Sequence, residues 1–453
     1  MSSFGKMGRF LRKIRFSFRL IKAFLQRHKK VLIASCLVSL CLFLLLPKIF
    51  HLLARKKALR IGLVGKFTIN ELPKKVQNLI SDGLTEIDNQ GQVKPKLAQS
   101  WETNHQGKEY LFRLKNNLFW HDGKPVLAED IQYNFQDVTT QILDNQTIKF
   151  ELLEPFSPFP AIVAQSIFKK GLVGTGEYQV KKITHNGQIV EKLTLANQQK
   201  KSQPLLIFRF YPTEKTALTA FKLGEIDQLD DIAKLQELDS WLNIQTEAKV
   251  KTDRYVAVFF NTQKPKLEEK STRQALAYAI DKHWQPRALG PFNPQSWAYN
   301  AQVKKYAYNP AKAKELLTKT NEDEALVIEK IELATVPSLL TVAEEIKKNW
   351  EAIGVATRIK VIASLDQDYE AILISQQSPS DPDQYVFWHS TQTLSANISH
   401  YKSPKLDKLL EDGRKTFDQE KRKTIYFDFQ KFLVEDTPAV FLYHPTLYTL
   451  TRN

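Results

Sequence analysis

The feature that most constrains this chain is an apolar run close to its N-terminus. Residues 31–46 read VLIASCLVSLCLFLLL, in which two Ser are the polar residues. A membrane-spanning helix needs about 20 apolar residues, and residues 31–50 reach that length if the Lys48 side chain extends its ammonium group to the interface. We therefore predict one transmembrane helix over residues 31–53, followed by a large module in water.

Basic residues flank this run unequally. Ten Lys and Arg precede it within thirty residues, which places the N-terminus in the cytoplasm by the positive-inside rule. A cleaved signal peptide needs small residues after the run, but FHLLARKKA follows. Cys36 resembles a lipoprotein cysteine but lies too early in the apolar stretch. The favoured interpretation is an uncleaved signal anchor, which makes a single-pass cell-membrane protein with an extracytoplasmic module.

Residues 1–30 are predicted to form a basic cytoplasmic segment with an amphipathic helix. Phe10, Ile14, Phe18, Ile21 and Leu25 recur every three or four positions, the period of one helix face. The basic residues fall largely off that stripe, as in helices that lie on an anionic membrane surface. The alternative is a charge cluster that sets topology without regular structure.

The charge of the chain is concentrated in its first part. The net charge is +16, but fourteen of the 65 Lys and Arg lie within residues 1–57, which hold no Asp or Glu. The other 51 basic residues nearly balance the 49 acidic ones. Binding of nucleic acid needs a basic face on the folded domain, and the near-neutral composition of the module does not indicate one. Both cysteines, Cys36 and Cys41, lie in the apolar run, which excludes disulfides and thiolate chemistry from the module.

Strand and helix patterns alternate from residue 58 onward. Apolar alternation or short buried runs predict strands at 59–64, 110–114, 147–152, 193–195, 206–210, 255–261, 356–362, 369–374 and 439–443. Helical periodicity predicts helices at 76–84, 128–138, 215–223, 272–280, 311–317, 340–353, 406–414 and 420–434. This mixture predicts an α/β fold in which helices cover sheets.

The sequence shows no motif of an enzyme. Gly-x-Ser-x-Gly, His-Glu-x-x-His and a Gly-rich phosphate loop do not occur. Asp381-Pro382-Asp383 suits either a bound cation or a loop with polar capping groups. Aromatic residues around Trp297 and Tyr385 suit either the walls of a ligand cleft or internal packing. We predict no catalysis, no cofactor and no metal site.

A series of segments in fixed order carries a family resemblance. It begins with LISDGLTEIDNQGQVKPKLAQSWE and YLFRLKNNLFWHDGKPVLAEDIQYNF. It continues with GTGEY, FKLGEID, FFNTQKP, TRQALAYAIDK, YNPAKAKELL and NWEAIGV. In this order the segments resemble the extracytoplasmic solute-binding proteins of peptide and nickel ABC importers (family 5), over most of residues 79–443.

The resemblance implies a two-lobed periplasmic-binding-protein-like fold of type II, in the peptide-binding cluster, behind the transmembrane helix. Lobe I is expected at 58–250, with one subdomain trimmed because the chain between Phe135 and Gly174 is shorter than in typical members. Lobe II is expected at 251–434. A C-terminal segment at 435–453 is expected to return to lobe I.

The resemblance also marks positions for ligand contact. In peptide-binding members a Gly-Trp pair follows a strand, and an Asp four residues before a Pro pairs with the peptide amine. Aligned on Pro382, these positions are Ile374, Ser375 and Ser378. A Ser has no carboxylate for a buried ammonium, so either Asp381 replaces that Asp or the ligand lacks the amine.

Further contacts are expected from strands and aromatic walls. The backbone near Ile374 and Asn261 would hold an extended ligand, with aromatic side chains beside it. The predicted ligand-binding residues are Tyr255, Asn261, Ile374, Ser375, Ser378, Asp381, Tyr385 and Trp388.

The predicted function is the membrane-tethered substrate-binding component of an ABC importer. It would capture peptides or similar small solutes between two lobes, without chemistry, and deliver them to ABC permease and ATPase subunits. The alternative is a cell-surface sensor or an assembly protein that reuses the same fold. The basic segment at 1–30 motivates this alternative, because a simple tether needs no such helix.

Overall fold

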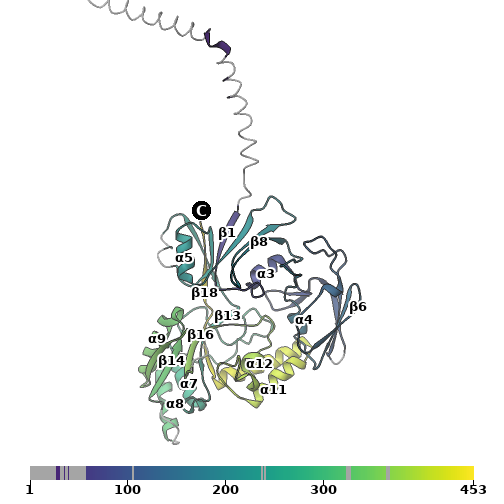
Figure 1. The fold of residues 1–453 in the computed structure, drawn as a ribbon. Helices are drawn as coiled ribbons and strands as arrows, with labels where there is room; N and C mark the ends of the chain where they lie inside the picture. The colour runs from purple at the N-terminus through teal and green to yellow at the C-terminus, as the bar shows by residue number, and fades with distance from the viewer. Residues whose placement is uncertain are drawn as a thin grey trace, which may run out of the picture. The chain divides into compact units, whose positions relative to one another are not determined.

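A computed structural model describes most of the chain after residue 57 (Figure 1). The described residues are 27–30, 35, 39, 58–104, 107–235, 238, 241–322, 328–363 and 368–452. The predicted cytoplasmic segment and transmembrane helix lie almost wholly outside them. Among the described residues, no helix combines the length and apolarity needed to cross a bilayer. Residues 59–201 and 206–453 form one compact unit.

The largest sheet of this unit has seven strands and belongs to lobe I. Its strands, in spatial order, are β12 (Ile244–Val250), β18 (Thr446–Arg452), β11 (Gln228–Ile232), β1 (Ala58–Val64), β10 (Leu205–Tyr211), β9 (Ile189–Asn197) and β8 (Tyr178–Asn186). Separate apolar clusters pack on it, one around Val76, Leu193 and Phe208 and one around Phe221 and Leu450. The last strand of the chain, β18, therefore lies inside the sheet that contains β1.

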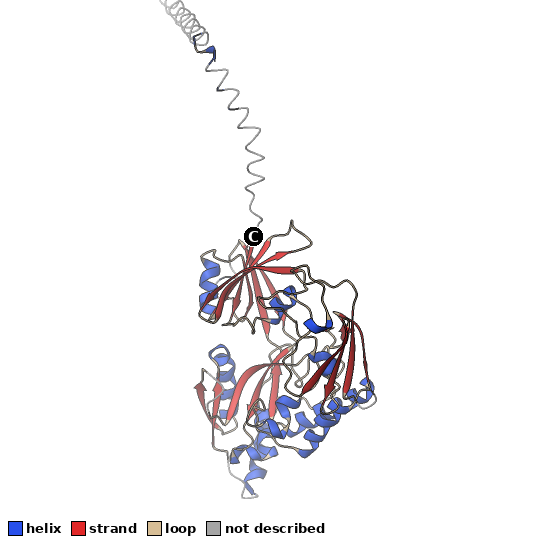
Figure 2. Cartoon of the chain, turned by 45° about the vertical axis from the view of Figure 1, so that its right-hand side comes forward, coloured by secondary structure: helices blue, strands red, loops and turns tan. Residues whose placement is uncertain are grey.

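A five-stranded sheet forms the centre of lobe II. Its order is β15 (Ala356–Val361), β14 (Lys330–Thr335), β16 (Ala371–Gln377), β13 (Arg254–Phe260) and β17 (Ala439–Tyr443). β13 is buried along nearly its whole length, as expected for a central strand with helices on both faces. Figure 2 shows this sheet as a group of strands separate from the seven-stranded sheet.

Two smaller sheets complete lobe I. One has four strands in the order β4 (Ala98–Thr103), β5 (Glu109–Leu114), β7 (Thr147–Leu152) and β6 (Val138–Asp144). The other pairs β2 (Thr85–Ile87) with β3 (Val93–Pro95). The four-stranded sheet has its own core, in which Phe112, Phe150 and Phe159 are fully buried.

The helices largely follow the predicted ranges. They are α3 (Lys74–Ile80), α4 (Phe159–Ile162), α5 (Glu214–Lys222), α6 (Pro265–Glu268), α7 (Lys270–Ala279), α8 (Pro310–Glu322), α9 (Leu340–Glu351), α10 (Tyr385–Trp388), α11 (Pro404–Lys415) and α12 (Gln419–Asp436). Short 3₁₀ turns occur at Ala128–Asp130, Pro337–Leu339 and Ser390–Gln392. Gly354 follows α9 with φ of 93°, the left-handed conformation of a helix-terminating glycine.

The helix predicted at 128–138 is wrong. The segment forms a single 3₁₀ turn at Ala128–Asp130 and then has no regular secondary structure until β6 begins at Val138. Ile131, Tyr133 and Phe135 alternate with polar residues, and all three pack on the core of the four-stranded sheet. Tyr133 and Phe135 stack at 5.2 Å. The sequence therefore carries a period of two, which the helical interpretation overlooked.

Candidate ligand-binding site

Two short crossings connect the seven-stranded sheet with the five-stranded sheet. β12 runs into β13 through residues 251–253, and β17 runs into β18 through residues 444–445 (Figure 1). The crossings bond to each other, since Lys251 N donates to Pro445 O at 2.9 Å. His444 Nδ1 lies 2.8 Å from Arg254 O. A few residues between two rigid sheets are the usual form of a hinge.

The end of β16 nearest these crossings has one unpaired edge. β14 stops at Thr335, opposite Leu373, and among the described residues no strand pairs with the later part of β16 on that side. The backbone N–H of Ser378 donates to Asp253 O and so points toward β13. Along a strand, the backbone groups of successive residues point alternately toward one neighbouring strand and the other. The backbone N–H and C=O of Ser375 and Gln377 therefore face the free edge, where an extended chain could add as a further strand.

Two of the predicted residues lie on one face of this sheet end. Tyr255 is opposite Gln376, and Ile374 is opposite Ala257, so these side chains share a face. Tyr255 is 1% exposed and meets Phe441 edge-on at 5.1 Å. Burial raises the pKa of the Tyr255 hydroxyl. The Ser375 side chain belongs to the opposite face and is exposed.

Trp388 and Ser378 are both buried beside this region. The Trp388 ring stacks on Phe259 at 5.9 Å, which places it over the Tyr255 face of the sheet. Ser378 is 6% exposed, and its hydroxyl donates to Pro291 O at 2.7 Å. The Ser378 side chain is thus already engaged with the protein.

Unpartnered polar atoms in this region escaped the sequence reasoning. Within the described part of the chain, Gln376 Oε1, Gln384 Nε2 and Trp388 Nε1 are buried and have no hydrogen-bond partner. The same is true of Arg254 Nε and His444 Nε2 at the crossings. Buried polar groups are normally satisfied, so such atoms are candidates to bind a ligand or water. Gln376 could have been suspected from its position on the strand between Ser375 and Ser378.

Asp381 is engaged by a buried arginine. Arg422 Nη2 and Nη1 donate to its two carboxylate oxygens at 2.6 and 3.0 Å. Arg422 also donates to Gly413 O at 2.9 Å. Burial alone lowers the pKa of Arg422, but the charge of Asp381 outweighs it and the pKa is raised overall. A ligand amine would have to compete with this guanidinium for the Asp381 carboxylate.

Asp383 forms a second arginine pair next to it. Arg414 Nη2 and Nε donate to Asp383 Oδ2 at 2.8 and 3.0 Å. The Arg414 guanidinium lies 3.7 Å from the centre of the Tyr385 ring. The His389 ring also stacks on Tyr385, with the two ring centres 3.9 Å apart. We call Asp381, Asp383, Arg414 and Arg422 the paired-arginine cluster. The Asp-Pro-Asp segment is therefore a loop fixed by ion pairs.

Asn261 lies at the far end of β13 from the other predicted residues. It lies six positions after Tyr255, which is roughly 20 Å along a strand. Its amide donates to Tyr369 O at 3.1 Å and accepts from Gln263 N at 3.1 Å. The structure thus gathers five of the predicted residues near the crossings: Tyr255, Ile374, Ser375, Ser378 and Trp388. Asp381 belongs to the paired-arginine cluster, Tyr385 packs against its Arg414, and Asn261 is separate from both groups.

A family model matches residues 92–397, more than half of the chain. Its description is "Bacterial extracellular solute-binding proteins, family 5 Middle". The chain belongs to this family. The match spans the four-stranded sheet, the crossing from β12 to β13 and the Asp-Pro-Asp loop. It confirms the resemblance carried by the ordered segments.

Relatives of this family 5 protein cover most of its length. The dipeptide-binding protein of Escherichia coli K12 is 23% identical over 446 residues, which span 80% of this chain and 83% of that protein. The structure of NikZ from Campylobacter jejuni with Ni(L-His) has a TM-score of 0.72 at 24% identity and covers 88% and 94%. AppA from Bacillus subtilis with a nonapeptide gives 0.69 at 20% identity and covers 88% and 95%. These likenesses establish the two-lobed α/β fold.

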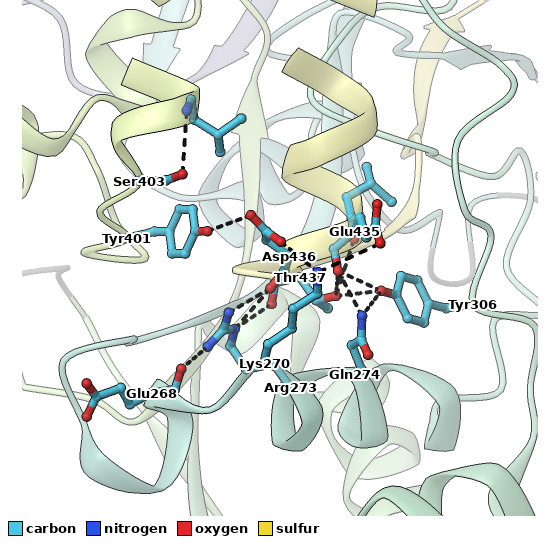
Figure 3. Close-up of polar contacts among 12 residues, drawn as sticks. Glu268, Lys270, Arg273, Gln274, Tyr306, Tyr401, Ser403, Glu435, Asp436 and Thr437 are labelled. Carbon is cyan, nitrogen blue, oxygen red and sulfur yellow. Dashed lines mark hydrogen bonds and ion pairs between the residues drawn. The ribbon is translucent and has the colours of Figure 1, made fainter. Parts of the chain in front are cut away.

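One family segment, TRQALAYAIDK, has a clear structural role in this family 5 protein. Arg273 donates from Nη2 to Asp436 O at 2.7 Å and from Nε to Thr437 O at 3.2 Å. From Nη1 it reaches Leu267 O at 2.9 Å. Figure 3 shows this guanidinium against the end of α12. Carbonyls at a helix C-terminus lack partners within the helix, so Arg273 fixes the turn from α12 into β17.

Neighbouring residues extend the same network. Gln274 Nε2 and Tyr306 OH both donate to Glu435 O, at 2.9 and 3.0 Å. Lys270 pairs with Asp436 at 2.9 Å, and Tyr401 OH donates to the same carboxylate at 2.7 Å (Figure 3). Since β17 leads directly into a crossing, this network positions the hinge rather than a ligand. No group of three or more His, Cys, Asp or Glu that could hold a metal occurs among the described residues.

Proposed function

We propose that this family 5 protein is the extracytoplasmic substrate-binding component of an ABC importer, and that it captures an extended peptide or a similar small solute between its lobes without reacting with it. An N-terminal signal anchor over residues 31–53 would hold it at the membrane, with residues 1–30 in the cytoplasm. Permease and ATPase subunits of the importer would be its partners.

The free edge of β16 is the observation that carries this proposal. Ser375 and Gln377 offer backbone groups to an added strand, and backbone bonding gives affinity that depends little on side-chain identity. The edge lies at the end of the sheet that meets the crossings, where closure of the lobes would enclose a ligand. Relatives and neighbours named for a dipeptide and a nonapeptide fit ligands of this extended form.

The recognition of a ligand amine would differ from that expected of peptide binders with an Asp at this position. Ser378 has no carboxylate, and Asp381 is bound to Arg422. The unpartnered groups of Gln376, Gln384 and Trp388 are neutral amide and indole groups. We therefore expect a ligand that presents neutral hydrogen-bonding groups here, such as a blocked or internal peptide segment.

A thermal-shift screen of the purified full chain tests the function. The panel contains free dipeptides, N-acetylated dipeptides, a nonapeptide and the nickel–histidine complex, because relatives are named for these classes. A ligand at 100 times its Kd adds about 2.7 kcal/mol to the stability of the folded protein. We expect a rise in Tm with peptides, larger for the acetylated than for the free forms. A panel that leaves Tm unchanged would refute the capture of these solutes.

A matched pair of variants tests the β16 edge itself. Ser375→Pro removes the N–H that faces the free edge, whereas Ser375→Ala keeps it. Proline is tolerated where the N–H has no partner in the sheet. We expect the Pro variant to bind the best panel peptide roughly 5–10-fold more weakly, the worth of about one hydrogen bond, and the Ala variant to bind like wild type. Equal affinity in both variants would exclude pairing at this edge.

A further inference from the structure

A pocket in lobe II is lined by four cationic side chains and, among the described residues, by no carboxylate. Its walls come from the segment after α7, the segment 304–306, and the turn from α12 into β17. The lining residues are Lys282, Arg287, Ala288, Leu289, Lys304, Lys305, Tyr306, Val434, Thr437, Ala439, Val440 and Phe441. We call it the cationic pocket. Its cavity volume is about 20 Å³, room for one atom of the size of a water oxygen.

Lys282 places its amino group at this pocket. Its Nζ donates to Ile280 O at 2.8 Å and Tyr306 O at 2.7 Å, and it also reaches Ala277 O. These carbonyls include two at the C-terminal end of α7, where a cation is favoured by the helix dipole. Capping of α7 therefore explains where the ammonium sits. It does not supply the negative charge that a buried cation requires.

Arg287 lies beside Lys282 with fewer bonds. Its guanidinium donates to Leu442 O, and this is its one hydrogen bond to the described residues. The remaining donors of the planar fork have the geometry that binds an anion from two directions. Burial lowers the pKa of Arg287 to about 10, which reports how poorly the protein itself compensates this charge. Lys304 and Lys305 are exposed and stand at the rim.

The acidic groups near the pocket are engaged elsewhere. Asp281 is about half exposed and faces His283 at 3.9 Å. Glu435 faces Lys270 at 3.8 Å. The Tyr306 hydroxyl donates to Glu435 O, and its ring lies 4.7 Å from Lys304 Nζ. The charge of Asp281 acts on Lys282 and partly offsets the lowering of its pKa. Among the described residues, however, no carboxylate lines the pocket.

We propose that the cationic pocket binds a free inorganic anion, either chloride or one oxygen of a phosphate ion, between the Arg287 guanidinium and the lysines at its rim. The proposal does not depend on the proposed transport function, since β16 contributes nothing to this pocket. An anion here would bridge the segment after α7 and the turn into β17, which the Arg273 network fixes from its other side.

Chloride-35 NMR on the purified full chain provides the test. Exchange of chloride with a bound site broadens the ³⁵Cl line in proportion to occupancy. We expect the excess line width of wild type to fall at least about twofold in Arg287→Gln, and to be unchanged in the matched control Arg358→Gln. Arg358 is exposed on β15 and distant in the fold from the pocket's walls. Equal broadening in wild type and Arg287→Gln would overturn the proposal.

A competition experiment on the wild-type protein tests whether the bound anion is a free inorganic ion or the carboxylate of a peptide. Adding sodium phosphate to wild type at constant ionic strength should narrow the line. A dipeptide with a free carboxylate should narrow it no more than its amidated form. If the free carboxylate narrows the line and phosphate does not, the occupant is a peptide rather than a free ion, and the proposal is wrong. If Arg287→Gln does not fold, Arg287→Lys is the substitute, because it keeps the positive charge and should keep the excess line width. Complete loss of the excess line width in Arg287→Lys would count against the site.

Discussion

Lobe II holds two groups of buried or half-buried cationic side chains that differ in their partners. In the paired-arginine cluster, each guanidinium meets a carboxylate, Arg422 with Asp381 at 2.6 Å and Arg414 with Asp383 at 2.8 Å. In the cationic pocket, Arg287 and Lys282 meet backbone carbonyls. The pKa of Arg422 is raised by Asp381 against the effect of burial, whereas burial lowers the pKa of Arg287.

The difference separates structural charge from charge that can serve a ligand. A buried pair that is internally neutral holds its loop in place, and removing one partner leaves the other uncompensated. A buried cation that contacts only carbonyl dipoles is not neutralised by the protein, so a diffusible anion can bind beside it. The two groups therefore predict opposite responses to mutation.

The largest effect is expected from breaking the more buried pair. Asp381→Ala leaves Arg422, whose side chain is 8% exposed, without its carboxylate. Removing one partner of a buried pair costs about 3–5 kcal/mol. The free energy of unfolding from a denaturant titration should fall by that amount.

A surface pair provides the matched control for this variant. Lys408 and Asp412 lie 2.6 Å apart on α11, but their side chains are 69% and 39% exposed. Exposed pairs contribute about 0–1 kcal/mol, so Asp412→Ala should change little. If Asp381→Ala cost no more than Asp412→Ala, the Asp381 carboxylate would be free to serve a ligand, as the sequence allowed.

Local sequence patterns predicted much of this fold because they record burial. The strand at 439–443 and the helix C-terminus before Gly354 follow from apolar runs and from a glycine that adopts positive φ. The helix prediction for 128–138 failed because Ile131 and Phe135, four positions apart, fit both a helical period and a period of two. The order of the strands in each sheet was not predictable, since it depends on pairings such as β11 with β18.

The candidate site was less predictable, for a physical reason. Asp381 and Arg422 are 41 positions apart, and no local pattern indicates that they pair. The free edge of β16 exists because β14 ends at Thr335, a relation between two distant strands. The cationic pocket similarly joins Lys282 and Arg287 to Phe441 across the turn from α12. Composition shows only that the module is near-neutral overall.

A smaller effect should appear as a pH dependence in the cationic pocket. Burial and the charge of Arg287 lower the pKa of Lys282 from 10.5 to about 7. Between these values the unfolded chain binds more protons than the folded one, so the free energy of unfolding should rise with pH from about 7 to 10.5. Relative to wild type, Lys282→Met should lose about 1–3 kcal/mol of that rise.

Titrations of stability against pH for both proteins measure this difference. Lys348→Met, at an exposed position of α9, is the control and should keep the wild-type slope. If Lys282→Met also kept that slope, the three carbonyls around the ammonium would hold its pKa near the ordinary value. Lys282 would then resemble the compensated arginines of the other cluster.

The smallest effect is expected from removing Arg287 in chloride-free buffer. Arg287→Gln retains an amide donor for Leu442 O and deletes a charge that has no carboxylate partner among the described residues. Replacing an uncompensated buried charge by a neutral group is often neutral or stabilising, so we expect a gain of about 0.5–1 kcal/mol. Arg414→Gln, which leaves Asp383 without its ion-pair partner, should instead lose stability in the same buffer.

Adding chloride should reverse the sign of the stability change for Arg287→Gln alone, because wild type then gains the bound anion and the variant does not. A loss of stability in Arg287→Gln that is independent of chloride would mean that the guanidinium acts as a packing and hydrogen-bonding group, and the distinction between the two groups of arginine would fail.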